Sequence, residues 1–232
     1  FFVGGGALLD IDLQRYYYAI GIPMYQGYGL SEATPIISAN SPARHIFGSS
    51  GKIVQPMEIK ILDADGVEQP FGSKGEICIK GENVMAGYWK NPKSTADTIV
   101  DGWLHTGDLA LRTPEGNYKI TGRLKDMIIR GGENIYPREI EEFLYKFPGI
   151  KDVQVAGIPS KKYGEEVGAF IIPQEGADLH ESDIKEFCKG KIAHYKIPKY
   201  VLFVEGFPLT GSGKIQKFKL KDVGLEMLKA QR

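Results

Sequence analysis

The sequence of 232 residues has little cysteine, no net charge and no long apolar run. Its two cysteines, Cys78 and Cys188, are too few for a disulfide framework or a zinc cluster, which favours a reducing, cytoplasmic location. Lys and Arg together number 29, as do Asp and Glu, so no global field attracts nucleic acid or an anionic membrane. No apolar run approaches the roughly 18 residues that a transmembrane helix needs. Any ligand must therefore bind at a local site.

The remaining composition is that of an ordinary globular protein, with 42% hydrophobic and 25% charged residues. The length predicts one or two domains. The chain begins Phe-Phe-Val-Gly-Gly-Gly, without an initiator methionine or a signal-peptide pattern, so we expect a piece of a longer protein. Residues 1–3 are typical of a buried strand that ends at a glycine turn.

Hydrophobic periodicity predicts a multidomain protein of the α/β and α+β classes. Residues 1–47 indicate a strand, a helix over 8–19 and a short strand over 23–25, as at the end of a large α/β domain. Residues 48–124 contain short runs of alternating apolar and polar residues between turn signals, which predicts a small β-rich, barrel-like subdomain.

Residues 125–232 predict a compact α+β domain that begins near Lys125. Pro137 can open a helix, and the apolar residues that follow it at i, i+3, i+4 and i+7 spacing lie on one face: Ile140, Phe143, Leu144 and Phe147. A second helix carries apolar residues from Ile184 to Ile192. Three apolar runs read as strands, over 153–158, 166–172 and 200–204.

Two glycine-rich segments near the start of the chain could contact a ligand. Gly4-Gly5-Gly6-Ala7 would let the backbone approach a flat ligand, although a tight structural turn explains it as well. The loop from Gln26 to Glu32 offers Tyr28 to stack a base, Ser31 to bond a phosphate and Glu32 to hold magnesium. The alternative is a turn followed by a helix with Ser31 as its N-cap.

Two further segments are equally ambiguous alone. In Trp-Leu-His-Thr-Gly-Asp, the acceptor-only carboxylate of Asp108 suits paired ribose hydroxyls, but Asp after Gly is also a common turn residue. His105 is better explained as a packed or surface histidine than as a base, because no nucleophile pattern accompanies it. Lys214 lies in a Gly-Ser-Gly-Lys hairpin that departs from the Walker spacing, and a mobile surface loop explains it as well.

Taken in order, these segments resemble the adenylate-forming superfamily of acyl-CoA synthetases, luciferases and peptide-synthetase adenylation domains. The order is more specific than any one motif, and the resemblance covers essentially the whole chain. Besides the segments above, it includes Gly122-Arg123-Leu124-Lys125-Asp126, Gly131-Gly132-Glu133-Asn134-Ile135-Tyr136-Pro137 and, as in fatty-acyl and aryl CoA ligases, Val84-Met85-Ala86-Gly87-Tyr88-Trp89 and His194-Tyr195-Lys196-Ile197-Pro198.

The resemblance implies a two-step ligase that uses ATP, Mg²⁺ and coenzyme A. A carboxylic acid, expected to be a fatty or other hydrophobic acid, attacks the α-phosphate of ATP, and the thiol of coenzyme A then displaces AMP. The resemblance assigns one role to each matching position: Gly5, Gly6, Ala7, Tyr28 and Gly29 frame adenine, Ser31 contacts the α-phosphate, Glu32 holds Mg²⁺, Asp108 accepts the ribose hydroxyls, Arg123 bonds ribose or phosphate, and Lys214 bridges the carboxylate and the α-phosphate.

The same resemblance makes Lys125 a hinge. The domain over 125–232 would swing between a state that inserts Lys214 and one that presents Gly131, Gly132 and Glu133 to the pantetheine of coenzyme A. From the residues alone, Lys125 is as well explained as a surface lysine. Oligomers are common in the family, but the sequence identifies no interface.

The alternatives are a fatty-acyl-AMP ligase, a luciferase-like oxygenase and a nucleotide-binding scaffold without activity. The first typically carries an insertion that is absent between Arg123 and Pro137, and the last has no need of Asp108, Arg123 and Lys214 together. The family's Ser/Thr/Gly-rich phosphate loop is not among the motifs of this chain. We therefore expect the 232 residues alone to show little adenylation.

Overall fold

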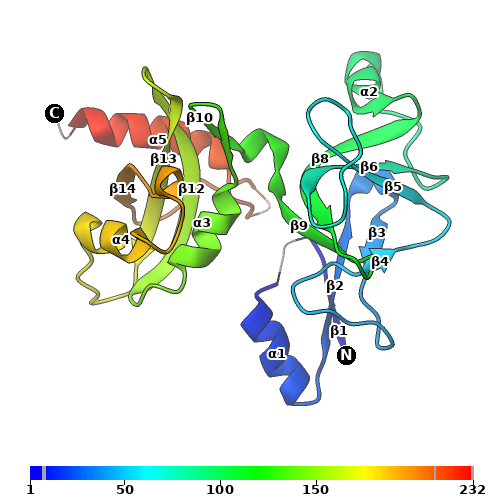
Figure 1. Ribbon diagram of the computed structural model, residues 1–232, viewed down its shortest axis with the longest axis horizontal. Coiled ribbons are helices and arrows are strands. Elements are labelled where there is room, and N and C mark those ends of the chain that lie inside the picture. The colour runs from blue at the N-terminus through cyan, green and yellow to red at the C-terminus, as the bar shows by residue number, and fades with distance from the viewer. Residues whose placement is uncertain (7–8, 212, 231–232) are drawn as a thin grey trace. The chain divides into compact units, whose positions relative to one another are not determined.

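The computed structural model describes residues 1–6, 9–211 and 213–230, and these divide into two compact units (Figure 1). The first unit is Phe1–Leu124 and the second is Lys125–Arg232. Both contain helices and sheets, so the mixed α/β class is confirmed. No helix in the described part of the chain has the length and apolar character needed to cross a membrane.

The first sheet of unit 1 has the order β1-β2-β3-β4. Its strands are β1 (Phe2–Gly4), β2 (Met24–Gly29), β3 (Ile36–Ala39) and β4 (Lys52–Ile53), and helix α1 (Ile11–Ala19) connects β1 to the parallel strand β2. The prediction of a buried first strand is wrong, because Phe2 and Val3 are 56% and 69% exposed. In the described chain only β2 pairs with β1, which leaves β1 at the edge of the sheet.

The second sheet of unit 1 is antiparallel, as period two predicted, and has the order β5-β6-β8-β7 with β9 beside β8. Its strands are β5 (Glu58–Leu62), β6 (Lys74–Lys80), β7 (Ile99–Val100), β8 (Trp103–Arg112) and β9 (Tyr118–Arg123), and the short helix α2 (Pro92–Thr98) precedes β7. Ile77 and Ile79 of β6 pack into a core with Ile61 and Leu104. Their alternation places Glu76 and Cys78 on the other face of β6.

Unit 2 is built on one five-stranded sheet with helices on both faces. Its elements are β10 (Ile128–Arg130), β11 (Glu133–Ile135), α3 (Pro137–Leu144), β12 (Ile150–Ser160), β13 (Gly164–Pro173), α4 (Glu181–Cys188), β14 (Tyr200–Phe203) and α5 (Lys217–Ala230), with a short 3-10 helix at His194–Lys196. Another 3-10 helix, Leu124–Asp126, includes the last residue of unit 1 and the first two of unit 2. Side chains of Val153 and Val155 pack with α3 and α4, whereas Ala156 and Ile158 pack with Leu220 of α5.

The predicted helices at Pro137 and Ile184 and the three predicted strands of this unit are confirmed. Pro137 occupies the first turn of α3, where its missing N–H costs nothing. Helix α4 ends at Cys188, however, so Ile192 is not part of it. Lys189 is already extended and Gly190 has a φ of 72°, which stops the helix.

Candidate functional site

The carboxylate of Asp108 is the centre of a polar cluster within unit 1. The phenol of Tyr28 donates a hydrogen bond of 2.7 Å to Asp108 Oδ2, and Arg123 Nε lies 3.2 Å from Asp108 Oδ1. Asp108 and Arg123 are direct partners across strands β8 and β9, so the sheet itself sets their spacing. The side chain of Asp108 is 13% exposed and that of Arg123 is 57% exposed. The sequence therefore brings together three of the predicted site residues.

The Tyr28 phenol is a hydrogen-bond donor in this cluster. Burial, and secondly the adjacent Asp108 carboxylate, raise the pKa of Tyr28 well above its usual range, so the phenol stays protonated in alkaline solution as well. An ionised carboxylate offers about four acceptor positions. Two donors fixed on opposite oxygens orient the carboxylate. Such a group can accept the paired hydroxyls of a ribose.

A bulge in β8 spans Thr106 to Asp108. Cys78 pairs with His105 and Glu76 pairs with Leu109, so one residue of β6 opposes three of β8. Gly107, in the middle of the bulge, has a φ of 69°. The sequence analysis did not predict this bulge. The two-residue alternation of β6 continues through it, and only β8 contains the extra residues.

Side chains close the bulge from both sides. The Thr106 hydroxyl donates to the carbonyl of Ile77 at 2.8 Å and accepts the amide of Asp108 at 3.1 Å. Glu76 Oε1 accepts the amide of Gly107 at 2.8 Å. Sequence reasoning missed Glu76, which looked like an ordinary polar residue of an alternating strand.

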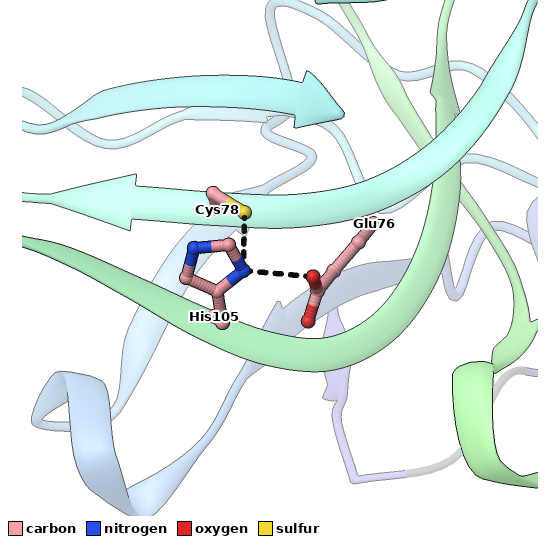
Figure 2. Close-up of side chains that lie close together, drawn as sticks. All are labelled: Glu76, Cys78 and His105. Atoms are coloured by element: carbon pink, nitrogen blue, oxygen red, sulfur yellow. Dashed lines mark hydrogen bonds and ion pairs between the residues drawn. The ribbon is translucent and has the colours of Figure 1, made fainter. Parts of the chain in front are cut away.

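Glu76, Cys78 and His105 converge beside the bulge (Figure 2). His105 Nδ1 lies 2.8 Å from Glu76 Oε2 and 3.4 Å from Cys78 Sγ. Burial, reinforced by the Glu76 carboxylate, raises the pKa of the Cys78 thiol to about 12. The three side chains form a hydrogen-bonded cluster. The interpretation of His105 as a packed histidine is consistent with these contacts.

Ser31 and Glu32 begin a short 3-10 helix, Ser31–Ala33, whose N-cap is Leu30. The alternative in which Ser31 caps a helix is therefore wrong. Gln26–Gly29, interpreted from sequence as part of a loop, belongs to β2. Glu32 Oε1 accepts a hydrogen bond of 3.0 Å from the partly exposed phenol of Tyr88. A single carboxylate of this kind fits Mg²⁺, which takes hard oxygen ligands and usually only one or two from protein.

The glycines of the predicted adenine frame differ in their surroundings. A Cβ on Gly5 or Gly6 would meet no atom within 4 Å, although Gly6 has a φ of 79°. A Cβ on Gly29 would lie 1.8 Å from the carbonyl oxygen of Pro35, so packing alone already requires glycine there. Ala7, the remaining member of the predicted frame, lies outside the described residues.

The predicted hinge and coenzyme A segment belong to unit 2. Lys125 is exposed in the 3-10 helix Leu124–Asp126. Gly131 and Gly132, with φ of 59° and 90°, form the two-residue turn between β10 and β11, and Glu133 follows as an exposed residue. Two positive φ angles in succession are typical of a type I′ hairpin, which explains the glycine pair.

Lys214 lies at the end of a hairpin in which Leu209 bridges to Ile215. The amide of Thr210 donates to the carbonyl of Lys214 at 2.8 Å, and the amide of Lys214 donates to the Thr210 hydroxyl at 3.0 Å. These bonds fix the backbone while the lysine side chain is exposed. An exposed ammonium on a fixed turn can approach an anion.

A buried carboxylate, also missed from sequence, anchors the segment that follows this hairpin. Glu141 Oε1 accepts the amide of Val155 at 2.8 Å and pairs with Lys217, the first residue of α5. The Glu141 and Lys217 side chains are only 11% and 21% exposed. Glutamate on the buried side of α3 was the available signal, because an unpaired carboxylate is rarely found there.

Comparison with known proteins agrees with the resemblance. A family model for AMP-binding enzymes matches residues 1–89, and a model for the AMP-binding enzyme C-terminal domain matches residues 139–214. The chain is 46% identical over 200 residues to a mitochondrial medium-chain acyl-CoA ligase, ACSF2, of Rattus norvegicus, covering 84% of this chain and 32% of the relative. It is 39% identical over 219 residues to a feruloyl-CoA synthase of Amycolatopsis sp, covering 94% and 45%.

Solved structures give the same result. ATP-bound MatB from Rhodopseudomonas palustris matches with a TM-score of 0.90 and 34% identity, covering 96% of this chain and 45% of that one. The o-succinylbenzoate CoA synthetase MenE from Bacillus subtilis, in complex with its acyl-adenylate intermediate, matches with a TM-score of 0.85 and 33% identity over 95% and 45%. The chain thus spans less than half the length of each of these proteins. The two family models together match more than half of the chain, which belongs to the adenylate-forming superfamily of AMP-binding enzymes.

Proposed function

We propose that the full-length protein is an AMP-forming acid–thiol ligase that makes an acyl-CoA from a carboxylic acid, ATP and coenzyme A. The observation that carries this proposal is the orientation of the Asp108 carboxylate by Tyr28 and Arg123. Relatives of this chain are named as CoA ligases, and solved neighbours hold ATP or an acyl-adenylate. A carboxylate that accepts both ribose hydroxyls would hold the nucleoside at the same place in both half-reactions.

The proposed reaction has two balanced steps. In the first, a carboxylate oxygen attacks the α-phosphorus of ATP, the bond to the β-phosphate breaks, and pyrophosphate leaves. In the second, the sulfur of coenzyme A attacks the acyl carbon, AMP leaves with the electron pair of the broken bond, and the thiol proton passes to solvent or a base. Binding and orientation of the reactants supply much of the rate in such reactions.

Residues of both units would share these tasks. Tyr28 would stack on adenine, with Gly5, Gly6, Ala7 and Gly29 beside the ring. Ser31 would donate to the α-phosphate, and Glu32 would hold a Mg²⁺ that neutralises phosphate charge. Arg123 would hold ribose or phosphate through its planar guanidinium.

We propose that unit 2 moves between the two half-reactions. Lys125 would act as the hinge, and Lys214 would place its positive charge between the attacking carboxylate and the α-phosphate. Gly131, Gly132 and Glu133 would line the path of pantetheine after the hinge has turned. The exposed Lys214 on its hydrogen-bonded turn supports the first of these roles.

We propose a fatty or other hydrophobic acid as the substrate. Named relatives act on medium-chain acyl groups and on ferulate, which share an extended apolar body beside one carboxylate. The two buried, free cysteines support a reducing compartment for the protein.

ATP–pyrophosphate exchange with the full-length protein and a panel of carboxylic acids tests the proposal. Exchange that depends on the acid, with coenzyme A consumed and AMP formed in equal amounts, is the expected result. Asp108→Asn should lower kcat/KM for ATP about ten- to a hundredfold, because the charged acceptor of two hydroxyls is lost. Asp65→Asn, an exposed turn residue of the same unit, is the matched control and should leave kcat/KM unchanged.

Three outcomes would contradict parts of the proposal. No exchange with any acid, together with no thermal stabilisation by AMP, would indicate a scaffold without activity. Acyl-adenylate that accumulates while coenzyme A is not consumed would indicate an acyl-AMP ligase. Equal activity of Asp108→Asn and the unsubstituted enzyme would remove the assigned ribose contact.

A further inference from the structure

We propose that Glu76 is a positioning residue for the ribose-binding carboxylate, although it touches no substrate. Its carboxylate closes the bulge of β8 that carries Asp108. The inference rests on the proposed function, because it concerns how that carboxylate is held in place. Neither the sequence motifs nor the comparisons assign any role to Glu76.

The backbone of the bulge needs side-chain hydrogen bonds to hold its conformation, because the regular pairing of β8 with β6 is interrupted there. Between the pairs Cys78–His105 and Glu76–Leu109, three residues of β8 face a single residue of β6. The regular pairing with β6 is interrupted there, and the amides of Gly107 and Asp108 bond to the side chains of Glu76 and Thr106. Gly107 is also the residue with a positive φ, at 69°, and its amide is the one that Glu76 accepts.

The two carboxylate oxygens of Glu76 accept hydrogen bonds from two residues of the bulged strand, His105 and Gly107. Oε1 accepts the amide of Gly107 at 2.8 Å, and Oε2 accepts Nδ1–H of His105 at 2.8 Å. One carboxylate therefore ties residue 105 to residue 107, immediately before Asp108. Figure 2 shows Glu76 and His105 turned toward each other across the neighbouring strands β6 and β8.

Burial makes these bonds effective. The Glu76 side chain is 16% exposed and that of His105 is 31% exposed. Hydrogen bonds to a charged group in such surroundings are stronger than neutral ones in water, and they resist screening by salt. Thr106 completes the constraint by bonding both the Ile77 carbonyl and the Asp108 amide. The backbone that carries Asp108 is thus held by hydrogen bonds of the Glu76 and Thr106 side chains.

The positioning of Asp108 by Glu76 can be tested with a nucleotide that lacks the ribose hydroxyls. The readout is the ratio of kcat/KM for ATP to kcat/KM for 2′,3′-dideoxy-ATP in acid-dependent pyrophosphate release by the full-length protein. This ratio does not depend on the fraction of enzyme that is folded. We expect the unsubstituted enzyme to prefer ATP by about ten- to a hundredfold, and Asp108→Asn to lose most of that preference.

Glu76→Gln should reduce the preference for ATP to about one-third or less of its original value, because an amide cannot accept both N–H groups as a carboxylate does. Glu58→Gln, an exposed glutamate on the adjacent strand β5, is the matched control and should keep the full preference. Thr106→Val gives an independent test through the other side of the bulge, should Glu76→Gln fail to fold. We expect it to reduce the preference as well.

The outcomes separate the two hypotheses. An unsubstituted enzyme that does not distinguish ATP from 2′,3′-dideoxy-ATP, or an Asp108→Asn enzyme that still does, would overturn the ribose assignment itself. If Asp108→Asn loses the preference while Glu76→Gln and Thr106→Val keep it in full, the positioning role is wrong. A loss of activity by Glu76→Gln that is equal for both nucleotides would show a purely structural role and would also overturn the proposal.

Discussion

The buried ion pair between Glu141 and Lys217 makes a quantitative prediction about unit 2. The pair joins α3 to the first residue of α5, and Glu141 also accepts the amide of Val155 in β12. Truncation by Glu141→Ala removes one charge-assisted bond to a backbone amide and strands a lysine that is only 21% exposed. We expect a loss of about 2–4 kcal/mol in the free energy of unfolding.

The conservative substitution Glu141→Gln should lower the free energy of unfolding by less than Glu141→Ala does. Glu141→Gln keeps an oxygen for the Val155 amide but loses the charge that Lys217 needs, so we expect a loss of about 1–2 kcal/mol. Lys217→Met keeps the apolar stem without the ammonium. Combining the two substitutions should recover part of the loss, because the stranded charge is then absent, and we expect a coupling of about 1–2 kcal/mol.

The neighbouring residue on α3 provides the control. Glu142 forms a hydrogen-bonded ion pair of 2.8 Å with Arg138, but its side chain is 51% exposed. Exposed i, i+4 pairs contribute only about 0.3–0.5 kcal/mol, so Glu142→Gln should be almost neutral. Urea unfolding of the full-length protein and hydrogen exchange of peptides from β12 and α5 measure the effects. Additive losses at Glu141 and Lys217, or equal losses for Glu141→Gln and Glu142→Gln, would refute the reasoning.

Two further predictions concern Lys214 and Cys78. Lys214→Ala should suppress adenylate formation in the full-length protein far more than thioester formation from a supplied acyl-adenylate, and equal loss in both half-reactions would contradict its role. Because burial, then the Glu76 carboxylate, raises the pKa of Cys78 from 9.0 to about 12, its alkylation at pH 7.5 should be about a thousandfold slower than that of an unperturbed thiol. The neutral thiol contributes stability fully below pH 9, and this contribution is lost between pH 9 and 12 as the unfolded chain ionises first. Cys78→Ala should therefore flatten the alkaline loss of stability in urea titrations, and rapid alkylation of native protein would contradict the assignment.

The sequence predicted regular elements where one period dominates. The two-residue alternation around Ile77 and Ile79 predicted the antiparallel sheet, and the helical spacing after Pro137 predicted α3. Helix α5 was not predicted, although Leu220, Val223, Met227 and Leu228 have helical spacing, and Gly224 interrupts their stripe at i+4. The structure explains that glycine, since a Cβ there would lie 2.9 Å from Ile158 and 3.0 Å from Phe170.

Glycine also misled the interpretation of β2. Gly27 and Gly29 flank Tyr28 and suggested a loop, whereas both are strand residues against which the backbone of another segment lies very close. Glycine within a strand often marks such an approach. The glycines that suggested a loop are therefore required by tight packing within the sheet.

Only part of the candidate site could be predicted from sequence, because the contacts between its residues depend on the register of the strands. Asp108 was named first from its own segment and Arg123 from motif resemblance. Their contact follows from the register of β8 and β9, which local periodicity cannot give because the register depends on where the ladder is interrupted. The interruption is a bulge. Its residues satisfy backbone hydrogen bonds and a positive φ at Gly107, and they do not form an apolar face that a periodic pattern would reveal. A group that satisfies such a bulge, as Glu76 does, has the sequence signature of any solvent-facing strand residue. Motif resemblance therefore finds the carboxylate that we propose binds the ligand, whereas only the register of the strands reveals Glu76, which bonds the bulge beside it.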